Sequence, residues 1–319
     1  MLGFLVVDKP PGITSHDVVA VMRAVLGIKK VGHTGTLDPF ATGVLPVAVG
    51  RATRLIPFLD EKVKVYEGTV TLGCSTDTGD PTGNVLLESP VPELSREKVE
   101  SVFKNFIGPI MQTPPPYSAV KINGKPLYKY AREGIEVSVP AREIRIDSIE
   151  LIEIRGNEID IRVRCGPGTY VRVLAEDIGV ALGTCAHLSA LRRTSSGQFS
   201  IEGSIQFEEL SMLVAERPDW KPVLRPERGQ ERVVWRERSV VRDALRDRVL
   251  NPIKALDHLP EVNLTDAAYM EVKRSGAVPP PPPGLQIGER WLGVRGESLV
   301  AVFERGENRG KIARMVDIT

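Results

Sequence analysis

The sequence lacks several features that would point to particular classes of protein. Its 319 residues include three cysteines, Cys74, Cys165 and Cys185, which are widely spaced and form no C-x-x-C pair. An odd and scattered set of cysteines argues against a disulfide framework and is typical of a reducing compartment, so we expect a cytoplasmic protein. The four histidines form no H-E-x-x-H motif and no cluster with cysteine. We therefore expect no metal site.

Long apolar runs and an excess of charge of one sign are also missing. No run approaches the roughly 20 apolar residues that span a bilayer. The N-terminus reaches Asp8 and Lys9 too early for a signal peptide, so we expect no membrane contact. The 42 Lys and Arg against 41 Asp and Glu leave a formal net charge of +1. This balance excludes a generic polyanion binder but not local basic patches.

The residues that are present have a globular composition, with 42% hydrophobic and 26% charged residues. Alternating or buried patterns predict strands at 4–7, 44–49, 66–72 and 159–165, and helical spacing predicts helices capped by Ser15 and Ser95 and another after Gly168. Gly27 is expected to end the first helix and Gly108 the second, and 29–43 is expected to be a loop. These elements follow no regular strand–helix–strand repeat, which indicates an α+β fold.

Composition divides the chain into three parts. Residues 1–216 carry most of the strand and helix patterns. The stretch 217–250 is expected to be a solvated linker, helical around Val240–Val249, because 217–249 holds ten Lys or Arg and six Asp or Glu. The five prolines Pro279–Pro283 exclude a helix and favour polyproline II. Strand patterns at Arg290–Val294 and Leu299–Glu304 predict a small all-β module over 251–319.

The densest motif runs through residues 32–46, G-H-T-G-T-L-D-P-F-A-T-G-V-L-P. Its glycines permit close approach of the backbone to a ligand, and Pro39 keeps Asp38 extended. From these residues alone Asp38 is either a turn aspartate in a strand connection or a fixed carboxylate with a chemical role.

This motif resembles the catalytic motif of the TruB-type bacterial tRNA pseudouridine-55 synthases, and five further segments resemble that family in the same order. They are Asp8–His16, Thr76–Asp80, Gln112–Gly134, Gly168–Arg172 and His187–Phe199. The resemblance implies a pseudouridine synthase catalytic domain over 1–216, with a mixed, largely antiparallel sheet flanked by helices and loops, and a C-terminal PUA-like RNA-binding β-barrel over 251–319.

The same resemblance implies the reaction, the isomerisation of uridine to pseudouridine at position 55 in the T-loop of tRNA. The partner is then the T-arm stem-loop of tRNA. No cofactor, metal or protein partner is implied, and nothing demands more than a monomer. Two other functions stay open: an RNA chaperone for which catalysis is secondary, and a guide-RNA-dependent pseudouridine synthase subunit.

Three residues match the family's catalytic set. Asp38 matches the essential aspartate, which either attacks C1′ or removes the C2′ proton to give a glycal. Arg172 matches the arginine that pairs with it, holds it ionised and lowers its pKa. The ordinary alternative for Arg172 is a surface ion pair in the first turn of a helix. Tyr66 matches the tyrosine that stacks on uracil and reaches C5, and its strand pattern also fits a core aromatic residue.

Other matches concern RNA binding. Tyr170 and Leu191 match residues that sandwich the base, His33 matches the histidine that inserts into the T-loop, and Lys9 lies in the family's opening segment. The stretch 112–140 matches a mobile insertion that closes over RNA. Its basic residues are interleaved with tyrosines, which suits phosphate contacts with stacking, although a solvated loop would look alike. The basic residues are Lys121, Lys125, Lys129 and Arg132.

Overall fold

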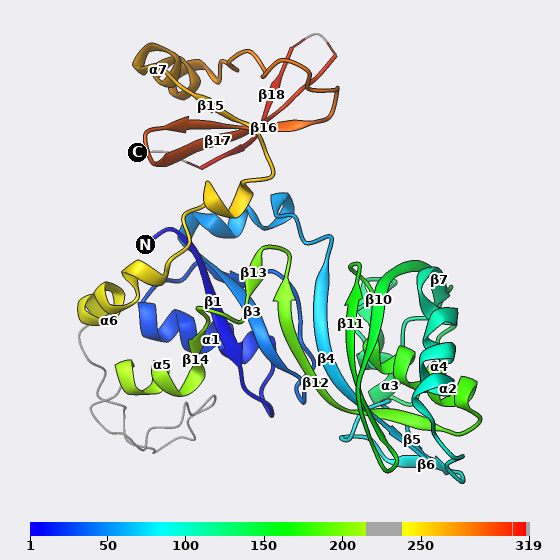
Figure 1. Cartoon of the computed structure of the whole chain (residues 1–319). Helices are drawn as coiled ribbons and strands as arrows, with labels where there is room; N and C mark the ends of the chain where they lie inside the picture. Colours follow the sequence, from blue (N-terminus) through cyan, green and yellow to red (C-terminus); the bar gives the residue numbers. More distant parts are fainter. Residues whose placement is uncertain (215–237, 308, 317–319) are drawn as a thin grey trace.

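The computed structural model describes residues 1–214, 238–307 and 309–316 (Figure 1). Its largest element is a ten-stranded sheet in the order β14-β1-β3-β12-β4-β11-β10-β7, with β2 attached to β3 and β13 to β12. The strands are β1 (Gly3–Lys9), β2 (Val31–His33), β3 (Thr42–Val49), β4 (Lys64–Leu72), β7 (Gly108–Gln112), β10 (Arg142–Arg155), β11 (Glu158–Cys165), β12 (Ala186–Ser196), β13 (Phe199–Ser200) and β14 (Ile205–Gln206). Within this described sheet only β1 with β14 and β3 with β12 pair in parallel, so the mixed, largely antiparallel prediction is confirmed.

Helices cover the sheet in two groups, each over its own apolar cluster. α1 (Ser15–Leu26) packs with β1 and β3, together with α5 (Phe207–Val214) and α6 (Arg238–Ala244). α2 (Arg96–Phe103) and α4 (Val171–Leu182) pack on β4, β11 and β10 at the other end (Figure 1). The site described below lies at the second of these clusters, because Leu37, Tyr66, Val171 and Leu191 belong to that cluster and also line the site.

The first helix begins differently from the prediction. Thr14, not Ser15, is the N-cap, because its hydroxyl accepts from the Asp17 amide and the Asp17 carboxylate accepts from the Thr14 amide in a capping box. Ser15 is instead buried, and its hydroxyl accepts from the Leu37 amide at 2.9 Å and donates to the Leu37 carbonyl at 3.2 Å. The helix therefore anchors the loop that carries Asp38. Gly27 ends the helix in the left-handed conformation, as predicted.

Smaller elements complete the larger part of the chain. Ser95 caps α2 as predicted, but the helix ends at Phe103 and continues as a 3-10 turn, so Gly108 begins β7 and does not end the helix. The predicted loop 29–43 contains the short strand β2 and the first residues of β3. The remaining elements are β5 (Cys74–Thr76), β6 (Val85–Glu88), β8 (Lys121–Ile122), β9 (Lys125–Pro126), α3 (Leu127–Arg132), η1 (Gly50–Arg54), η2 (Ile56–Phe58), η3 (Lys104–Phe106), η4 (Arg246–Arg248) and η5 (Lys254–Leu256).

The C-terminal part forms its own sheet, β15-β16-β17-β18, drawn at the top of Figure 1. It comprises β15 (Glu261–Asn263), α7 (Asp266–Ser275), β16 (Arg290–Arg295), β17 (Ser298–Glu304) and β18 (Lys311–Met315). The two predicted strands are confirmed as β16 and β17. The predicted barrel is wrong for the described residues, where these strands form an open four-stranded sheet. A barrel needs strand pairing all the way round, and β15 and β18 pair only with β16 and β17.

The C-terminal sheet is attached to the larger sheet by a shared apolar cluster. Leu292 of β16 and Val302 of β17 pack in one cluster with Phe4, Val44 and Ala48 of β1 and β3.

The predicted linker is described only in its second part, because residues 217–237 lie outside the described residues. Residues 238–249 contain α6 and η4, so the helix expected around 240–249 is confirmed in part. Residues 279–283 form neither helix nor strand. In the described ranges no helix is long and apolar enough to cross a membrane.

Candidate active site

A pocket of about 190 Å³ opens between the β2–β3 loop, β4, β12 and the start of α4. This is well above the roughly 30 Å³ that one water molecule occupies in the liquid. Five of the residues singled out from the sequence line it together: Asp38, Tyr66, Tyr170, Arg172 and Leu191. Residues from four separate segments of the chain therefore meet in one cavity that holds a carboxylate, a guanidinium and apolar walls.

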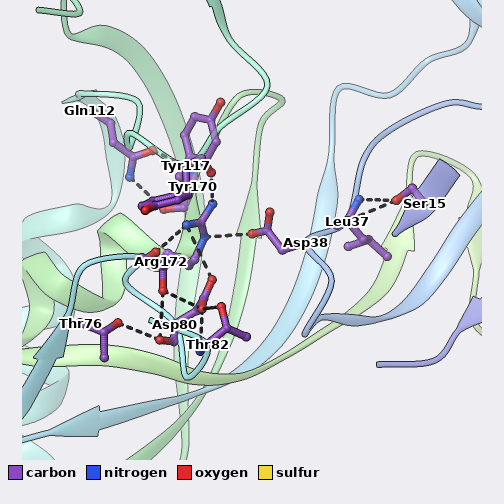
Figure 2. Close-up of polar contacts among 11 residues, drawn as sticks. Ser15, Leu37, Asp38, Thr76, Asp80, Thr82, Gln112, Tyr117, Tyr170 and Arg172 are labelled. Carbon is purple, nitrogen blue, oxygen red and sulfur yellow. Dashed lines mark hydrogen bonds and ion pairs between the residues drawn. The ribbon is translucent and has the colours of Figure 1, made fainter. Parts of the chain in front are cut away.

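The chain on either side of Asp38 is fixed by its neighbours. Leu37 exchanges two hydrogen bonds with Ser15 (Figure 2). The Pro39 carbonyl accepts from the Gly12 amide at 2.8 Å and from the Lys9 ammonium at 3.2 Å. The Asp38 carboxylate is thereby held in one place without help from a ligand.

Arg172 is the partner of Asp38, and it is buried. Its Nε donates to Asp38 Oδ2 at 2.9 Å, while Nη1 and Nη2 donate to the carbonyls of Thr78 at 2.6 Å and Tyr117 at 2.8 Å (Figure 2). Its side chain is 3% exposed. The alternative of a surface ion pair is therefore wrong, and the fork of the guanidinium fixes the direction from which Asp38 is held.

The Thr76–Asp80 turn explains one of the matched motifs. Asp80 lies 3.8 Å from Arg172 as a second carboxylate. The hydroxyls of Thr78 and Thr82 donate to Asp80 Oδ1, and the Thr76 hydroxyl donates to the Asp80 carbonyl (Figure 2). These bonds hold the turn so that the Thr78 carbonyl and Asp80 both face Arg172.

Burial dominates the electrostatics of Asp38. It raises the pKa of the Asp38 carboxyl above its ordinary value, Arg172 opposes the rise, and Asp80 adds to it. Arg172 lowers this pKa as predicted, but desolvation outweighs the opposite charge, so the net shift of the Asp38 pKa is upward. One third of the side chain, 33%, stays exposed, and Asp38 lines the pocket. The carboxylate thus has access to a ligand there while the protein restricts its solvation.

The apolar and aromatic walls of the pocket come from strands β4 and β12 and from the residue that precedes helix α4. Tyr66 of β4 is 8% exposed, belongs to a core cluster and also lines the pocket. Its place in the core is confirmed, and its role toward a base stays a prediction. Tyr170 precedes α4 and is held by Gln112, which accepts from its amide at 2.8 Å and donates to its carbonyl at 3.1 Å. Leu191 of β12 is also 8% exposed.

His33 comes directly before the β2–β3 loop that carries Asp38, but it is not among the residues that line the pocket. It ends β2, and its ring meets that of His16 edge to face at 5.2 Å. Burial, His16 and Arg193 lower the pKa of His33 to about 4. The imidazole is therefore neutral near pH 7, which suits a stacking role and not a charged contact to phosphate.

Lys9 does not fit the expectation that it contacts RNA. Its side chain is fully buried, and Nζ donates to the carbonyls of Pro10 at 2.8 Å and Pro39 at 3.2 Å. Burial lowers the pKa of Lys9 to about 8, with Asp38 opposing. Lys9 therefore acts here as a positioning residue for the Asp38 loop, because the chain around it covers the ammonium.

The insertion 112–140 is built from the β8–β9 hairpin and α3, and part of it reaches the pocket. Ser118 and Ala119 line the cavity, and Leu127 is buried. Its basic residues lie on the outside, where Lys121, Lys129 and Arg132 are exposed and Lys125 and Arg132 lie over tyrosine rings at 4.4 and 5.5 Å. The mobility of this insertion in the absence of RNA stays a prediction.

Sequence reasoning missed two cations next to the pocket, Lys64 and Arg193. Arg193 has no exposed surface and pairs across the sheet with Tyr66. Its Nε donates to the Val44 carbonyl at 2.8 Å and Nη2 to the Gly35 carbonyl at 3.2 Å. Strand alternation could have found it, because residues two apart face the same side and Leu191 had already been placed at the pocket.

Comparison of the sequence with known proteins agrees with the family resemblance of its motifs. A family model described as the N-terminal domain of TruB family pseudouridylate synthases matches residues 23–171, and one described as the C-terminal domain of tRNA pseudouridylate synthase B matches 172–254. The chain is 45% identical over 279 residues to a tRNA pseudouridine synthase B of Geotalea uraniireducens, covering 88% of this chain and 81% of that one. It is 44% identical over 307 residues to the protein of that name from Bacillus licheniformis, covering 94% and 89%.

Solved structures give the same fold. A structure titled as an H/ACA RNP bound to a substrate RNA containing 2′-deoxyuridine superposes with a TM-score of 0.68 at 27% identity, covering 99% of this chain and 85% of that one. A Cbf5-Nop10-Gar1 complex gives a TM-score of 0.66 at 29% identity, covering 100% and 84%. Among the described residues no group of three or more His, Cys, Asp or Glu could hold a metal ion.

Proposed function

Because the chain belongs to the TruB family of pseudouridylate synthases, we propose that it isomerises uridine to pseudouridine at position 55 in the T-loop of tRNA. The observation that carries this proposal is the ion pair between Asp38 and the buried Arg172, 2.9 Å apart, in the wall of a pocket bounded by Tyr66, Tyr170 and Leu191. The names of the curated relatives support tRNA as the substrate. The six matched motifs support position 55.

The target nucleotide must leave the base stack to reach this pocket, at a cost of a few kcal/mol. Tyr66, Tyr170 and Leu191 supply rings and an apolar surface that offset part of the cost by stacking. Asp38 then faces the ribose from the pocket wall. It either attacks C1′ or takes the C2′ proton, and both routes break the N1–C1′ bond with the electron pair going to N1.

In the second half of the reaction, the electron pair left on the detached uracil forms the new bond between C5 and C1′. The freed uracil turns within the pocket and C5 bonds to C1′. This step releases Asp38 from C1′ on the first route, or returns the C2′ proton from Asp38 on the second. C5 then loses its proton, and N1 gains one. Atoms and electrons balance without a cofactor, because the product is an isomer of the substrate. Tyr66 lines the pocket, and we propose that it takes the C5 proton. Arg193 supports this role, since it pairs with Tyr66 across the strands and opposes the rise that burial causes in the pKa of Tyr66.

The proposed reaction is tested by release of tritium from a tRNA transcript labelled at C5 of uridine. The purified chain alone, with no guide RNA, partner protein or cofactor, is expected to release tritium in proportion to the pseudouridine that forms. Release only after a guide RNA is added would identify a guide-dependent subunit. Binding and refolding of tRNA without any release would identify an RNA chaperone.

His33→Ala is expected to weaken tRNA binding and turnover moderately, by about tenfold each. The neutral ring no longer fills the space that flipped nucleotides leave, but the catalytic pair is untouched. Affinity by filter binding and single-turnover rate check this result. His33→Phe keeps a ring and serves as the matched variant, so it should recover most of the affinity. If His33→Ala binds and reacts like the wild type, the insertion role is wrong.

A further inference from the structure

Lys64 is a cation in the pocket that the catalytic roles above leave unused. It begins β4, two residues before Tyr66, so both side chains face the same side of the strand and both line the pocket. The Lys64 side chain is 13% exposed. A lysine is rarely buried to this extent unless its charge has a partner or a function.

The charges around Lys64 do not cancel. Its carboxylate partner, Glu61, is 3.6 Å away, which is longer than a good hydrogen bond. Arg193 adds a second buried cation. Its guanidinium donates to the uncharged carbonyls of Val44 and Gly35. Both cations approach Gly35, where a Cβ atom would lie 3.3 Å from Lys64 Nζ, 3.6 Å from Arg193 Nη1 and 3.8 Å from Glu61 Oε2. Two cations therefore face one carboxylate at this point. This side of the pocket is therefore electropositive.

Arg172 is engaged mainly by the protein itself. Three of its five N–H groups donate to Asp38, Thr78 and Tyr117, and its side chain is 3% exposed. Lys64 differs, since an ammonium has three donors and the contact to Glu61 engages one of them at most. Lys64 and Arg172 are the cations among the described residues that line the pocket, and Lys64 is the more exposed of the two, at 13% against 3%.

On the basis of the proposed function, we propose that Lys64 is a further catalytic residue, which stabilises the uracil anion released when the N1–C1′ bond breaks. In that step the bonding electrons pass to N1 and spread over O2 and O4. The ammonium donates a hydrogen bond to this anion and keeps its proton. The negative charge disappears when C5 attacks C1′, so Lys64 is needed only while the base is detached.

Burial lowers the pKa of Lys64 and Glu61 opposes the change. A desolvated ammonium interacts more strongly with an anion than a hydrated one does, because the low local polarity strengthens the attraction. A purely structural role is the competing explanation, with Lys64 holding the Gly35 backbone and hence the Asp38 loop. The two roles differ in how they respond to the acidity of the departing base.

The test uses tRNA transcripts that carry either uridine or 5-fluorouridine in the T-loop, with cleavage of the target nucleoside measured in single turnovers. Fluorine withdraws electrons and stabilises the anion, so the departing base needs less help. For Lys64→Met we expect cleavage of uridine to slow by about 100-fold and that of 5-fluorouridine by about tenfold. Affinity for tRNA is expected to stay within about threefold of wild type. Lys64→Arg should keep most of the rate.

The matched control is Lys62→Met, because Lys62 is 86% exposed and lies two residues away; it should react like the wild type with both transcripts. Equal slowing of the two bases by Lys64→Met, or none, overturns the proposal. Should Lys64→Met fail to fold, Lys64→Gln gives the same comparison with a polar side chain. A wild-type chain that cleaves neither nucleoside refutes the proposed function itself, which keeps the two failures apart.

Discussion

Asp38→Asn is expected to lower turnover by about four orders of magnitude or more while tRNA still binds. The amide keeps the size and shape of the carboxylate, but it can neither attack C1′ nor accept the C2′ proton. Arg172 keeps hydrogen bonds to the carbonyls of Thr78 and Tyr117, and Asp80 remains 3.8 Å away. The surroundings of the site therefore survive the change.

The same variant is expected to fold at least as stably as the wild type. Burial raises the pKa of Asp38 in the folded chain, so the folded state favours the neutral acid more than the unfolded state does. Ionised Asp38 therefore destabilises the fold at pH values above its unfolded pKa, and an uncharged amide removes that effect.

Denaturant unfolding, filter binding and single-turnover rates measure the three properties of Asp38→Asn. Asp257→Asn makes the same chemical change at an exposed position and should leave all three unchanged. Conversion of T-loop uridine by Asp38→Asn at a rate near that of the wild type would remove the basis for assigning the reaction to this carboxylate.

Arg172→Lys is expected to reduce turnover by about a thousandfold and to lower the free energy of unfolding by about 3 kcal/mol. A lysine keeps the positive charge, but it cannot hold Asp38 and two carbonyls at once from the same buried position. Partners that Arg172 now satisfies would be left without a donor inside the protein. The loss of turnover and the loss of stability should appear together, because the same side chain orients Asp38 and donates to the Thr78 carbonyl.

The pH profile gives a second signature of Arg172. Catalysis requires the Asp38 carboxylate, so the rate falls as pH drops through its pKa. Arg172 opposes the rise that burial causes in this pKa. Weakening the pair in Arg172→Lys should therefore raise the pKa further and move the acid limb of the profile to higher pH.

Arg96→Lys is the matched control for Arg172→Lys, since Arg96 is 52% exposed and pairs with Glu100 on a helix surface. Exposed pairs of this kind contribute about 0–1 kcal/mol, so neither rate nor stability should change measurably. Wild-type stability together with an unmoved acid limb in Arg172→Lys would show that this buried arginine does not control Asp38.

Local patterns were sufficient to predict most elements around the site. Spacing of apolar residues gave α1 and α4, and alternation gave β4 and β11, because each of these signals lies within one short segment. The pairing of Asp38 with Arg172 joins residues 134 positions apart. No local pattern contains that contact, so it was inferred from the family resemblance and then seen in the geometry.

The features that sequence reasoning missed depend on burial. Lys9 was expected at the RNA surface, but it is enclosed and holds Pro39. The sequence shows the opposite charge of Arg172, which lowers the pKa of Asp38, but it does not show the loss of solvent that raises this pKa overall. Arg193 is fully buried as well. Desolvation depends on all neighbours in three dimensions, and a single sequence does not contain that information directly.

Position-resolved mapping of pseudouridine in an unmodified tRNA transcript tests the central claim most directly. The transcript is incubated with the purified chain alone, and every uridine is examined, with Asp38→Asn in parallel. We expect one pseudouridine, at position 55 of the T-loop, from the wild-type chain and none from the variant. Pseudouridine at other positions only, or equal conversion by both proteins, would contradict the account.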